Sequence, residues 1–333
     1  MVEVFQAPVT AKEVKAKAHA LGIDLVGIAD GKIMDAHPPD PKNPLRPCDI
    51  SDYDADRVIV LARRHNMGTT RLTRPDERHK YYNDELNLTM LEEASLELVL
   101  WLEDRGYPAL IIPPTHVDPW TYRGDPDAPL DTILSLTHAA VEAGLGTLGL
   151  NQQLLTPEYG PRVVLSAVLS SVPVEPDVKH TDTLCLGPAC GRCLLACPGD
   201  VIGHWDRDWT ACNRLRSPHG FHALTEQVER IIDEPDIAKK KDMLRSPEQF
   251  YLWQSILRGA GVVTGCRRCQ DVCPVGEDYA QLADALDEIA EATDEKRIRL
   301  DAMVQTETAG DLPPSYTTAE RWIGALPTGK QEE

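Results

Sequence analysis

The sequence contains two cysteine runs, Cys185-Leu-Gly-Pro-Ala-Cys190-Gly-Arg-Cys193-Leu-Leu-Ala-Cys197-Pro198 and Cys266-Arg-Arg-Cys269-Gln-Asp-Val-Cys273-Pro274. Between them lies a single further cysteine, Cys212. Together they hold eight of the nine cysteines in the chain. Eight thiolates are the number that two [4Fe–4S] clusters need, and such clusters carry single electrons, usually at low potential. The runs therefore predict a two-cluster electron-transfer module.

The spacing also predicts which cysteines share a cluster, because the cysteine before proline in two-cluster ferredoxins binds the other cluster. We assign a first cysteine group made of Cys185, Cys190, Cys193 and Cys273. The second cysteine group is made of Cys197, Cys212, Cys266 and Cys269. One feature departs from the usual pattern: four residues, rather than two, separate Cys185 from Cys190.

Zinc and disulfides are the alternative interpretations of paired cysteines. Zinc ribbons use Cys-x2-Cys pairs, but a Cys-Pro ending three residues later fits a zinc site poorly. Disulfides need an oxidising compartment, and the first residues, MVEVFQAPVTAKEV, contain neither a secretory pattern nor a twin arginine. We therefore expect a cytoplasmic protein with reduced thiols, in which the ninth cysteine, Cys48, is inert.

The composition narrows the classes of partner. A chain of 333 residues can bury a sizeable core and is expected to form two domains with a tail. Its net charge of −19 argues against nucleic acid and anionic membranes, because binding to phosphates needs clustered Lys and Arg. No apolar run approaches the roughly 20 residues that span a bilayer. From this balance we expect no nucleic acid and no membrane partner.

Hydrophobic patterning predicts an alternation of helices and strands through the first half, which favours an α/β layered fold. A capping box at Thr10–Glu13 opens a helix that Gly22 ends. Strands are expected at 23–29, 57–62, 109–113 and 163–171, and helices at 82–104 and 132–143. Residues 30–54 and 113–130 are expected to be loops. One or two helices are expected between Cys212 and Cys266, a helical stretch at 279–303, and a loosely ordered end of about thirty residues.

The stretch His138–Arg162 is the second informative feature of the sequence. Gly144, Gly146 and Gly149 follow a predicted helix, whereas the glycines of a dinucleotide-binding fingerprint precede one. They allow a positive φ or a close approach of the backbone to a large flat group. A helix C-cap followed by a tight turn is the structural alternative.

Four polar residues around this stretch are candidate catalytic groups, each with a structural alternative. His138 has a pKa suited to acid–base chemistry, or it is a structural helix residue near Glu142. Tyr159 is a possible proton donor or a loop anchor. Arg162 is suited to holding an anion bidentately or forms an ion pair. Asp131 is a possible acid or a helix N-cap.

At this point the residues resemble a known superfamily. The segment Thr137–Arg162, with GLG and TPEYGPR, is similar to cobalamin-dependent reductive dehalogenases and to epoxyqueuosine reductase. In both families it precedes a ferredoxin-like double-cluster module, and the isolated Cys212 also matches epoxyqueuosine reductase. The resemblance covers residues 130–280, and more weakly the N-terminal half. It implies an α+β fold, with an α/β layered cobalamin-binding-type domain at 1–175, a ferredoxin-like two-[4Fe–4S] domain at 176–280 and an acidic helical tail at 281–333.

The resemblance further implies a base-off cobalamin held between the two domains, with a tyrosine or carboxylic acid as proton donor. It would be held by Gly144, Gly146, Gly149, Thr156 and Tyr159. The catalytic candidates are Tyr159, His138, Arg162 and Asp131, although Asp131 is one position out of register with the acidic residue of epoxyqueuosine reductase.

We therefore expect a reductase with two [4Fe–4S] clusters and cobalamin that cleaves a C–X or C–O bond of a small organic substrate. Its electrons would come from a low-potential donor of the ferredoxin or flavodoxin type. The alternative is an electron-transfer or accessory iron–sulfur protein of the same fold without its own substrate. A tRNA substrate is not expected, because the net charge is −19 and the chain ends about 60 residues after Cys273.

Overall fold

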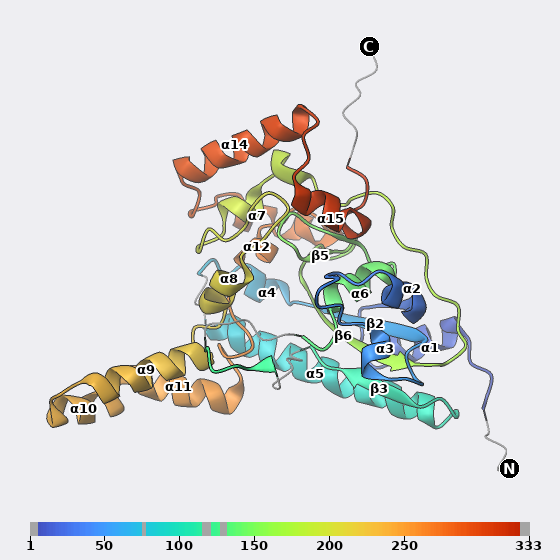
Figure 1. Ribbon diagram of the computed structural model, residues 1–333, viewed down its shortest axis with the longest axis horizontal. Coiled ribbons are helices and arrows are strands. Elements are labelled where there is room, and N and C mark those ends of the chain that lie inside the picture. The colour runs from blue at the N-terminus through green and yellow to red at the C-terminus, as the bar shows by residue number, and fades with distance from the viewer. Residues whose placement is uncertain (1–5, 75–77, 115–120, 127–131, 327–333) are drawn as a thin grey trace.

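A four-stranded sheet organises the first half of the computed structural model, which describes residues 6–74, 78–114, 121–126 and 132–326 (Figure 1). The strand order is β1-β2-β6-β3, and each neighbouring pair is antiparallel. The strands are β1 (Leu25–Asp30), β2 (Arg57–Arg64), β3 (Ala109–Ile112) and β6 (Val163–Ser170). Their Val, Ile and Leu runs favour a pleated, buried surface. The four predicted strands and the mixed helix–sheet class are confirmed.

Two helices cover one face of this sheet. They are α1 (Ala11–Ala20) and the long α5 (Arg78–Glu103). The predicted capping box begins α1: the Thr10 hydroxyl accepts from the Glu13 N–H, and the Glu13 carboxylate accepts from the Thr10 N–H. Leu91, Leu98 and Leu102 of α5 are fully buried against the sheet. This layer forms one of the two main cores.

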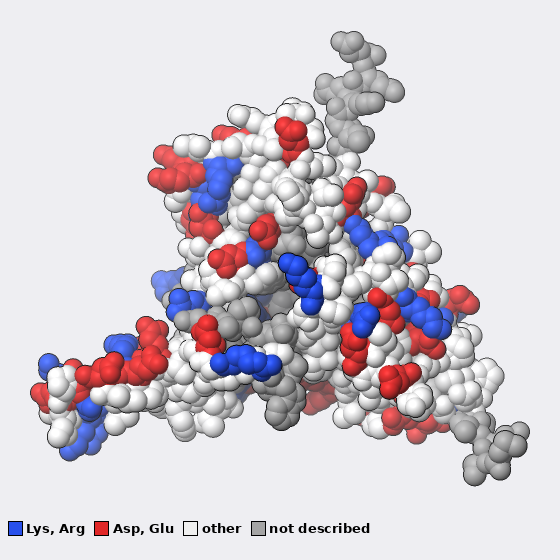
Figure 2. Space-filling model, in the orientation of Figure 1, with Lys and Arg blue, Asp and Glu red and all other residues white. Residues whose placement is uncertain are grey.

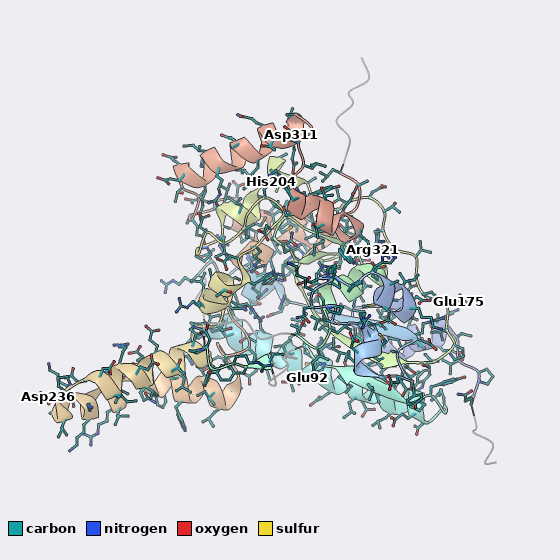
Figure 3. All side chains as sticks on the ribbon, viewed as in Figure 1. Glu92, Glu175, His204, Asp236, Asp311 and Arg321 are labelled. Atoms are coloured by element: carbon teal, nitrogen blue, oxygen red, sulfur yellow. The ribbon has the colours of Figure 1, made fainter. Side chains whose placement is uncertain are left out.

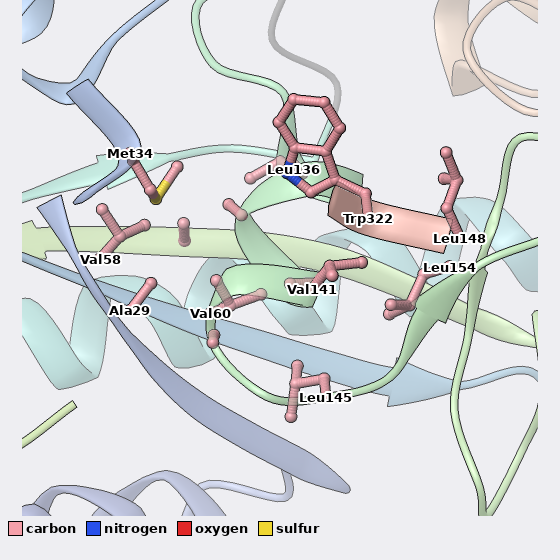
Figure 4. Packing of buried hydrophobic residues seen from close by; sticks show 14 of the residues in the cluster. Ala29, Met34, Val58, Val60, Leu136, Val141, Leu145, Leu148, Leu154 and Trp322 are labelled. Carbon is pink, nitrogen blue, oxygen red and sulfur yellow. The ribbon is translucent and has the colours of Figure 1, made fainter. Parts of the chain in front are cut away.

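The opposite face of the sheet is covered by α6 (Leu136–Glu142), and α15 (Pro314–Ile323), from the far end of the chain, packs on α6. Trp322 lies over α6 beside Leu136 (Figure 4), and both belong to the second core. Arg321 donates two hydrogen bonds to Glu142, at 2.7 and 2.9 Å (Figure 3 labels Arg321). The prediction of a loosely ordered end is therefore wrong for 314–326, because an amphipathic helix docks there; residues 327–333 lie outside the described residues.

Short helices occupy the stretch 30–54, which was predicted to be one long loop. They are α2 (Gly31–Ala36), which Asp30 caps through its carboxylate, and α3 (Pro47–Ile50). A further helix, α4 (Met67–Thr70), follows β2. A short hairpin of β4 (Thr147–Leu148) and β5 (Leu154–Leu155) follows α6 and leads toward the cysteine-rich region.

The cysteine-rich region is made of short elements. They are η2 (Gly187–Ala189), α7 (Arg192–Leu195), α8 (Trp209–Arg216), α12 (Arg268–Asp271), η3 (Glu277–Gln281), α13 (Ala283–Leu286) and α14 (Asp294–Thr308). The helix α14 packs against η2 and α7. The described part of the predicted tail, up to residue 326, therefore packs against both other parts of the molecule, α14 against the cysteine-rich elements and α15 against α6, and the three domain ranges stay a prediction.

A helical arm projects from the body between Cys212 and Cys266 (Figure 1). It contains α9 (Phe221–Asp233), α10 (Ile237–Leu244) and α11 (Pro247–Arg258), one helix more than the sequence predicted. Asp236 caps α10 at the outer end of the arm (Figure 3). Acidic and basic side chains alternate along the arm (Figure 2). In the described part of the chain, no helix combines the length and the apolar character that crossing a bilayer requires.

Candidate iron–sulfur site

A cavity in the cysteine-rich region is lined by all four members of the first cysteine group. Leu150, Leu155 and Val275 complete much of its wall. The cysteines reach it from three places: Cys185 precedes η2, Cys190 and Cys193 flank the start of α7, and Cys273 follows α12. Segments about eighty residues apart in sequence thus converge on one apolar cavity.

The long gap after Cys185 is taken up by a tight turn. Gly187 adopts a positive φ of 62° and begins the 3-10 turn η2, which takes up the two extra residues, while Leu186 and Gly187 themselves line the cavity. The Cys185 Sγ accepts hydrogen bonds from the backbone N–H of Leu150 (3.3 Å) and of Gly187 (3.4 Å). The structure therefore places Cys185 with the other three thiols despite its spacing.

The second cysteine group lies deeper. Cys197, Cys212 and Cys269 are all buried in one cluster with Leu194, Ile202 and Met303. The fourth member, Cys266, begins the turn before α12, and its N–H donates to the Arg216 carbonyl at 3.2 Å. Cys273 lines the first cavity with Cys185, Cys190 and Cys193, and Cys197 is buried with Cys212 and Cys269, which is the arrangement that the partner exchange predicted from the Cys-Pro endings requires.

Burial keeps the thiols of Cys193, Cys269 and Cys273 protonated when nothing is bound. It raises the pKa of Cys269 and of Cys273 to about 12, and it raises the pKa of Cys193 well above its ordinary value. Neighbouring thiols add to the effect: those of Cys185 and Cys273 raise the pKa of Cys193 further. Such sites release protons when iron binds, because the ligand is the thiolate.

The donor set fits [4Fe–4S] clusters, which are held by four thiolates, one on each iron. Among the described residues, no group of three or more His, Cys, Asp or Glu side chains is placed to hold a single metal ion. All nine cysteines are free thiols.

Buried charges link the second cysteine group to the α/β layer. Lys80 of α5 is fully buried and donates to Asp271 of α12 at 2.6 Å. Arg267, beside Cys266, donates to Asp84 at 2.9 Å and to Asp271 at 3.1 Å. His65 lies 3.1 Å from Asp84, and burial lowers the pKa of this imidazole. The network ties α5 to the loop that carries Cys266, Cys269 and Cys273.

Arg162 is fully buried, and its partners all lie within the chain. Its guanidinium donates to both carboxylate oxygens of Asp278, and also to the carbonyls of Cys273 and Val275, each at 2.7 Å. Arg162 does bind an anion bidentately, as predicted, but that anion is the carboxylate of Asp278 in the same chain. Arg162 therefore positions the loop that carries Cys273.

Gly160 in the TPEYG turn is required by a close approach of two loops. Its φ is 52°, and a Cβ atom at this position would lie 1.9 Å from the Val275 carbonyl oxygen. Thr156 is buried and ties the turn together by accepting from the Tyr159 N–H and donating to the Gly160 carbonyl. The shape of this turn thus serves to seat the loop after Cys273.

We expect Gly160→Ala to lower the free energy of unfolding by about 2 kcal/mol, because it combines left-handed strain with a clash against backbone. Thermal unfolding measured with iron content checks this, and the first cysteine group should lose iron as the loop shifts. Gly68→Ala is the matched control, since only Asn66 lies within 4 Å of its Cβ position, at 3.9 Å. Equal melting temperatures for the two variants would contradict the expectation.

The two phenols of the region lie in different surroundings. Tyr159 is half-buried under Arg64, whose guanidinium carbon is 5.8 Å from the ring centre. Burial raises the pKa of Tyr159. Tyr279, which the sequence analysis missed, lies between Arg162 and Arg192 and close to Cys273 and Cys190. Of these two phenols, Tyr279 is the one that lies near cysteines of the first group.

His138 lies away from this region, in a separate cavity lined by His37, Glu142 and Trp322 among others. Its Nδ1 lies 2.6 Å from the Ser135 hydroxyl, and its ring packs edge-on against Trp322 at 4.7 Å. Burial lowers the pKa of His138 to about 4. The structure does not join it to Tyr159, and Asp131 lies outside the described residues.

The neutral imidazole of His138 makes the free energy of unfolding depend on pH. Because the pKa of His138 is about 4 when folded and near 6.5 when unfolded, its stabilising effect is complete above pH 6.5 and declines as pH falls toward 4. We expect this group to account for about 2 kcal/mol of the stability lost between pH 7 and pH 5. Urea unfolding at both pH values should show that His138→Phe loses less stability between pH 7 and pH 5 than the wild-type protein, by that amount. An equal loss in the two proteins would contradict the lowered pKa of His138.

The space beside the three glycines of the GLG segment is filled by the chain itself. A Cβ at Gly144 would lie 2.5 Å from the Val178 carbonyl oxygen, and one at Gly146 would lie 1.8 Å from that of Leu155. A Cβ at Gly149 would meet Asn151 at 2.8 Å. Gly144 follows α6 with a φ of 72°, as a helix C-terminal glycine does. These glycines allow internal packing, and they do not form an open cradle for a corrinoid.

Comparison with known proteins places the chain among reductases. No family model matches the sequence. An epoxyqueuosine reductase from Bacillus subtilis is 42% identical over 148 residues, and one from Listeria monocytogenes is 32% identical over 149 residues. Each match covers 44% of this chain and 31% of the relative. The matched segment therefore spans about a third of the length of these relatives, which are oxidoreductases by name.

The fold agrees with the sequence matches. A catabolic reductive dehalogenase superposes with a TM-score of 0.53 at 16% identity, over 94% of this chain and 38% of that chain. The resemblance seen in the sequence is confirmed: part of the chain is similar to epoxyqueuosine reductases, and its fold is similar to that of a reductive dehalogenase.

These relatives correct the expected class of partner. A solved epoxyqueuosine reductase holds an epoxyqueuosine-modified tRNA stem loop; it is 19% identical, with a TM-score of 0.44 over 80% of this chain and 65% of that chain. The expectation of a small-molecule substrate and no nucleic acid is contradicted by the curated relatives, which share the name of that reductase. It relied on the net charge of the whole chain, and a summed charge does not describe a local binding surface.

Proposed function

We propose that the chain is an iron–sulfur reductase in which the first and the second cysteine group each hold one [4Fe–4S] cluster in a ferredoxin-like arrangement. The observation that carries this proposal is the convergence of eight thiols from three separate segments into two sets of four. Free thiols suit a reducing compartment such as the cytoplasm. When bound, such clusters supply single electrons at low potential.

The chain's own residues supply the setting for this chemistry. Arg162 and Asp278 hold the Cys273 loop, while Leu150, Leu155 and Val275 exclude water from the first cavity. Tyr279 lies beside that cavity, and burial raises the pKa of its phenol, so its hydroxyl stays protonated at neutral pH. A phenol in that state is able to donate a proton next to the first cysteine group.

For the reaction we propose reductive cleavage of a C–O bond. This is the bond type of an epoxide, the group that appears in the name of the curated relatives. Removing an epoxide oxygen consumes two electrons and two protons and releases water. An external low-potential reductant supplies the electrons. The substrate to be tested first is an epoxyqueuosine-modified tRNA stem loop, because a related reductase has been captured with one.

Cobalamin stays a prediction of the superfamily resemblance, and we assign no corrinoid contact to Gly144, Gly146 or Gly149. The test is anaerobic turnover of the modified stem loop by iron-loaded protein, with and without cobalamin, under a low-potential reductant. Queuosine formed only with cobalamin supports the whole proposal. Reducible clusters with no product under either condition would overturn the proposed reaction while leaving cluster binding intact.

A further inference from the structure

One buried arginine points directly at a cysteine of the second group. Arg207 is 9% exposed, and its Nη2 donates a hydrogen bond to the Cys212 Sγ at 2.7 Å. Its Nη1 donates to the Asn151 carbonyl at 2.9 Å. Cys197 and Cys269 are also close enough to stabilise its charge. A permanent cation is thus buried among three thiols of one group.

The surrounding chain fixes this cation in place. Arg207 forms a β-bridge with Ile202 within the loop that leads into α8. The Trp209 ring lies 4.5 Å from its guanidinium carbon. Its Nε is buried and has no hydrogen-bond partner among the described residues. Burying a cation with an unsatisfied donor is costly, so a compensating negative charge is expected beside it.

The first cysteine group lacks an equivalent contact. The hydrogen bonds to Cys185 come from the neutral amides of Leu150 and Gly187. Arg162 lies near Cys273, but its guanidinium donates to Asp278 and to backbone carbonyls rather than to sulfur. Among the described residues, the hydrogen bond from a guanidinium to a cysteine sulfur is the one between Arg207 and Cys212 of the second group.

We propose that Arg207 tunes the redox centre of the second cysteine group, making its reduction potential higher than that of the first. This inference rests on the proposed function, since it requires both groups to hold clusters. Reduction adds one negative charge to a cluster and its thiolates. A cation that donates a hydrogen bond to a ligand sulfur stabilises the reduced form more than the oxidised form. Electrons therefore settle first on the second group.

The test is a redox titration followed by electron paramagnetic resonance, on anaerobic protein with its iron counted. The wild-type protein should show two midpoint potentials. Arg207→Gln should shift the higher one downward by at least tenfold in equilibrium constant, about 59 mV for one electron, and leave the lower one in place. Arg207→Lys, which keeps the charge, should shift it less. Arg230→Gln is the control, because Arg230 pairs with Glu248 on the exposed arm.

Unchanged midpoints in Arg207→Gln with full iron would overturn the role of Arg207 without affecting cluster binding. A shift of the lower midpoint alone would overturn it as well. If Arg207→Gln loses iron, the wild-type protein labelled with ¹⁵N-arginine tests the contact instead. Pulsed electron paramagnetic resonance should then detect an arginine nitrogen coupled to the centre that is reduced first. Absence of that coupling would contradict the contact. Iron missing from the wild-type protein would instead overturn the proposed function.

Discussion

Replacing Cys212 by serine is expected to remove half of the bound iron, from about eight atoms per chain to about four. Cys212 is the isolated ligand of the second cysteine group and is buried with Cys197 and Cys269. Serine leaves three thiolates and a hydroxyl, which is a poor ligand for iron in this environment. Iron and acid-labile sulfide, measured per chain after anaerobic reconstitution, check the result, as does the visible absorption of the cluster.

The matched control for this variant is Cys48→Ser. Cys48 is exposed in α3, far in sequence from both groups, and should retain all of the iron. The two variants change the same chemical group at one predicted ligand and at one non-ligand. Full iron in Cys212→Ser, or an equal loss in both variants, would contradict the assignment of the second cysteine group.

Replacing Lys80 by methionine is expected to lower the free energy of unfolding by about 3–5 kcal/mol. Both Lys80 and Asp271 are fully buried, and their 2.6 Å contact joins α5 to α12. The variant leaves the Asp271 carboxylate beside Arg267 alone, so part of its charge is no longer compensated. Urea unfolding of anaerobic, iron-loaded protein measures the change through the midpoint and the slope.

A double variant separates the pair from its packing. Lys80→Met combined with Asp271→Leu removes both charges and should recover much of the lost stability. Lys32→Met is the surface control, because its contact with Asp56 is largely exposed and should contribute little. If Lys80→Met unfolds at the wild-type urea concentration, the buried network does not hold α5 against the cysteine-rich region.

Local sequence signals were sufficient for several elements of the fold. The capping box at Thr10 and the β-branched runs of β1, β2 and β6 predict their elements because each is decided by neighbouring residues. The grouping of the cysteines relies on the spacing rule of two-cluster ferredoxins and stays a prediction. The helix α15 was missed because its amphipathic pattern finds its partner, α6, some 180 residues earlier in the chain.

The surroundings of the site were not predictable from the sequence. Lys80 reaches this region through long-range folding, 191 residues from Asp271 in sequence. Arg207, Asp271 and Tyr279 lie close to cysteines in the sequence, but they form no recognisable motif with them. Arg162 was selected as an anion binder for the right chemical reason, but Asp278 lies 116 residues away and could not be identified as its partner. The GLG glycines suggested a ligand, whereas the folded chain fills the space beside them.

The convergence of two sets of four thiols is the central claim, and iron analysis joined to a redox titration of anaerobically purified protein tests it most directly. We predict about eight iron and eight sulfide per chain, with two reducible centres of distinct midpoint potential. Stoichiometric zinc in place of iron, or a single reducible centre with about four iron atoms, would contradict it.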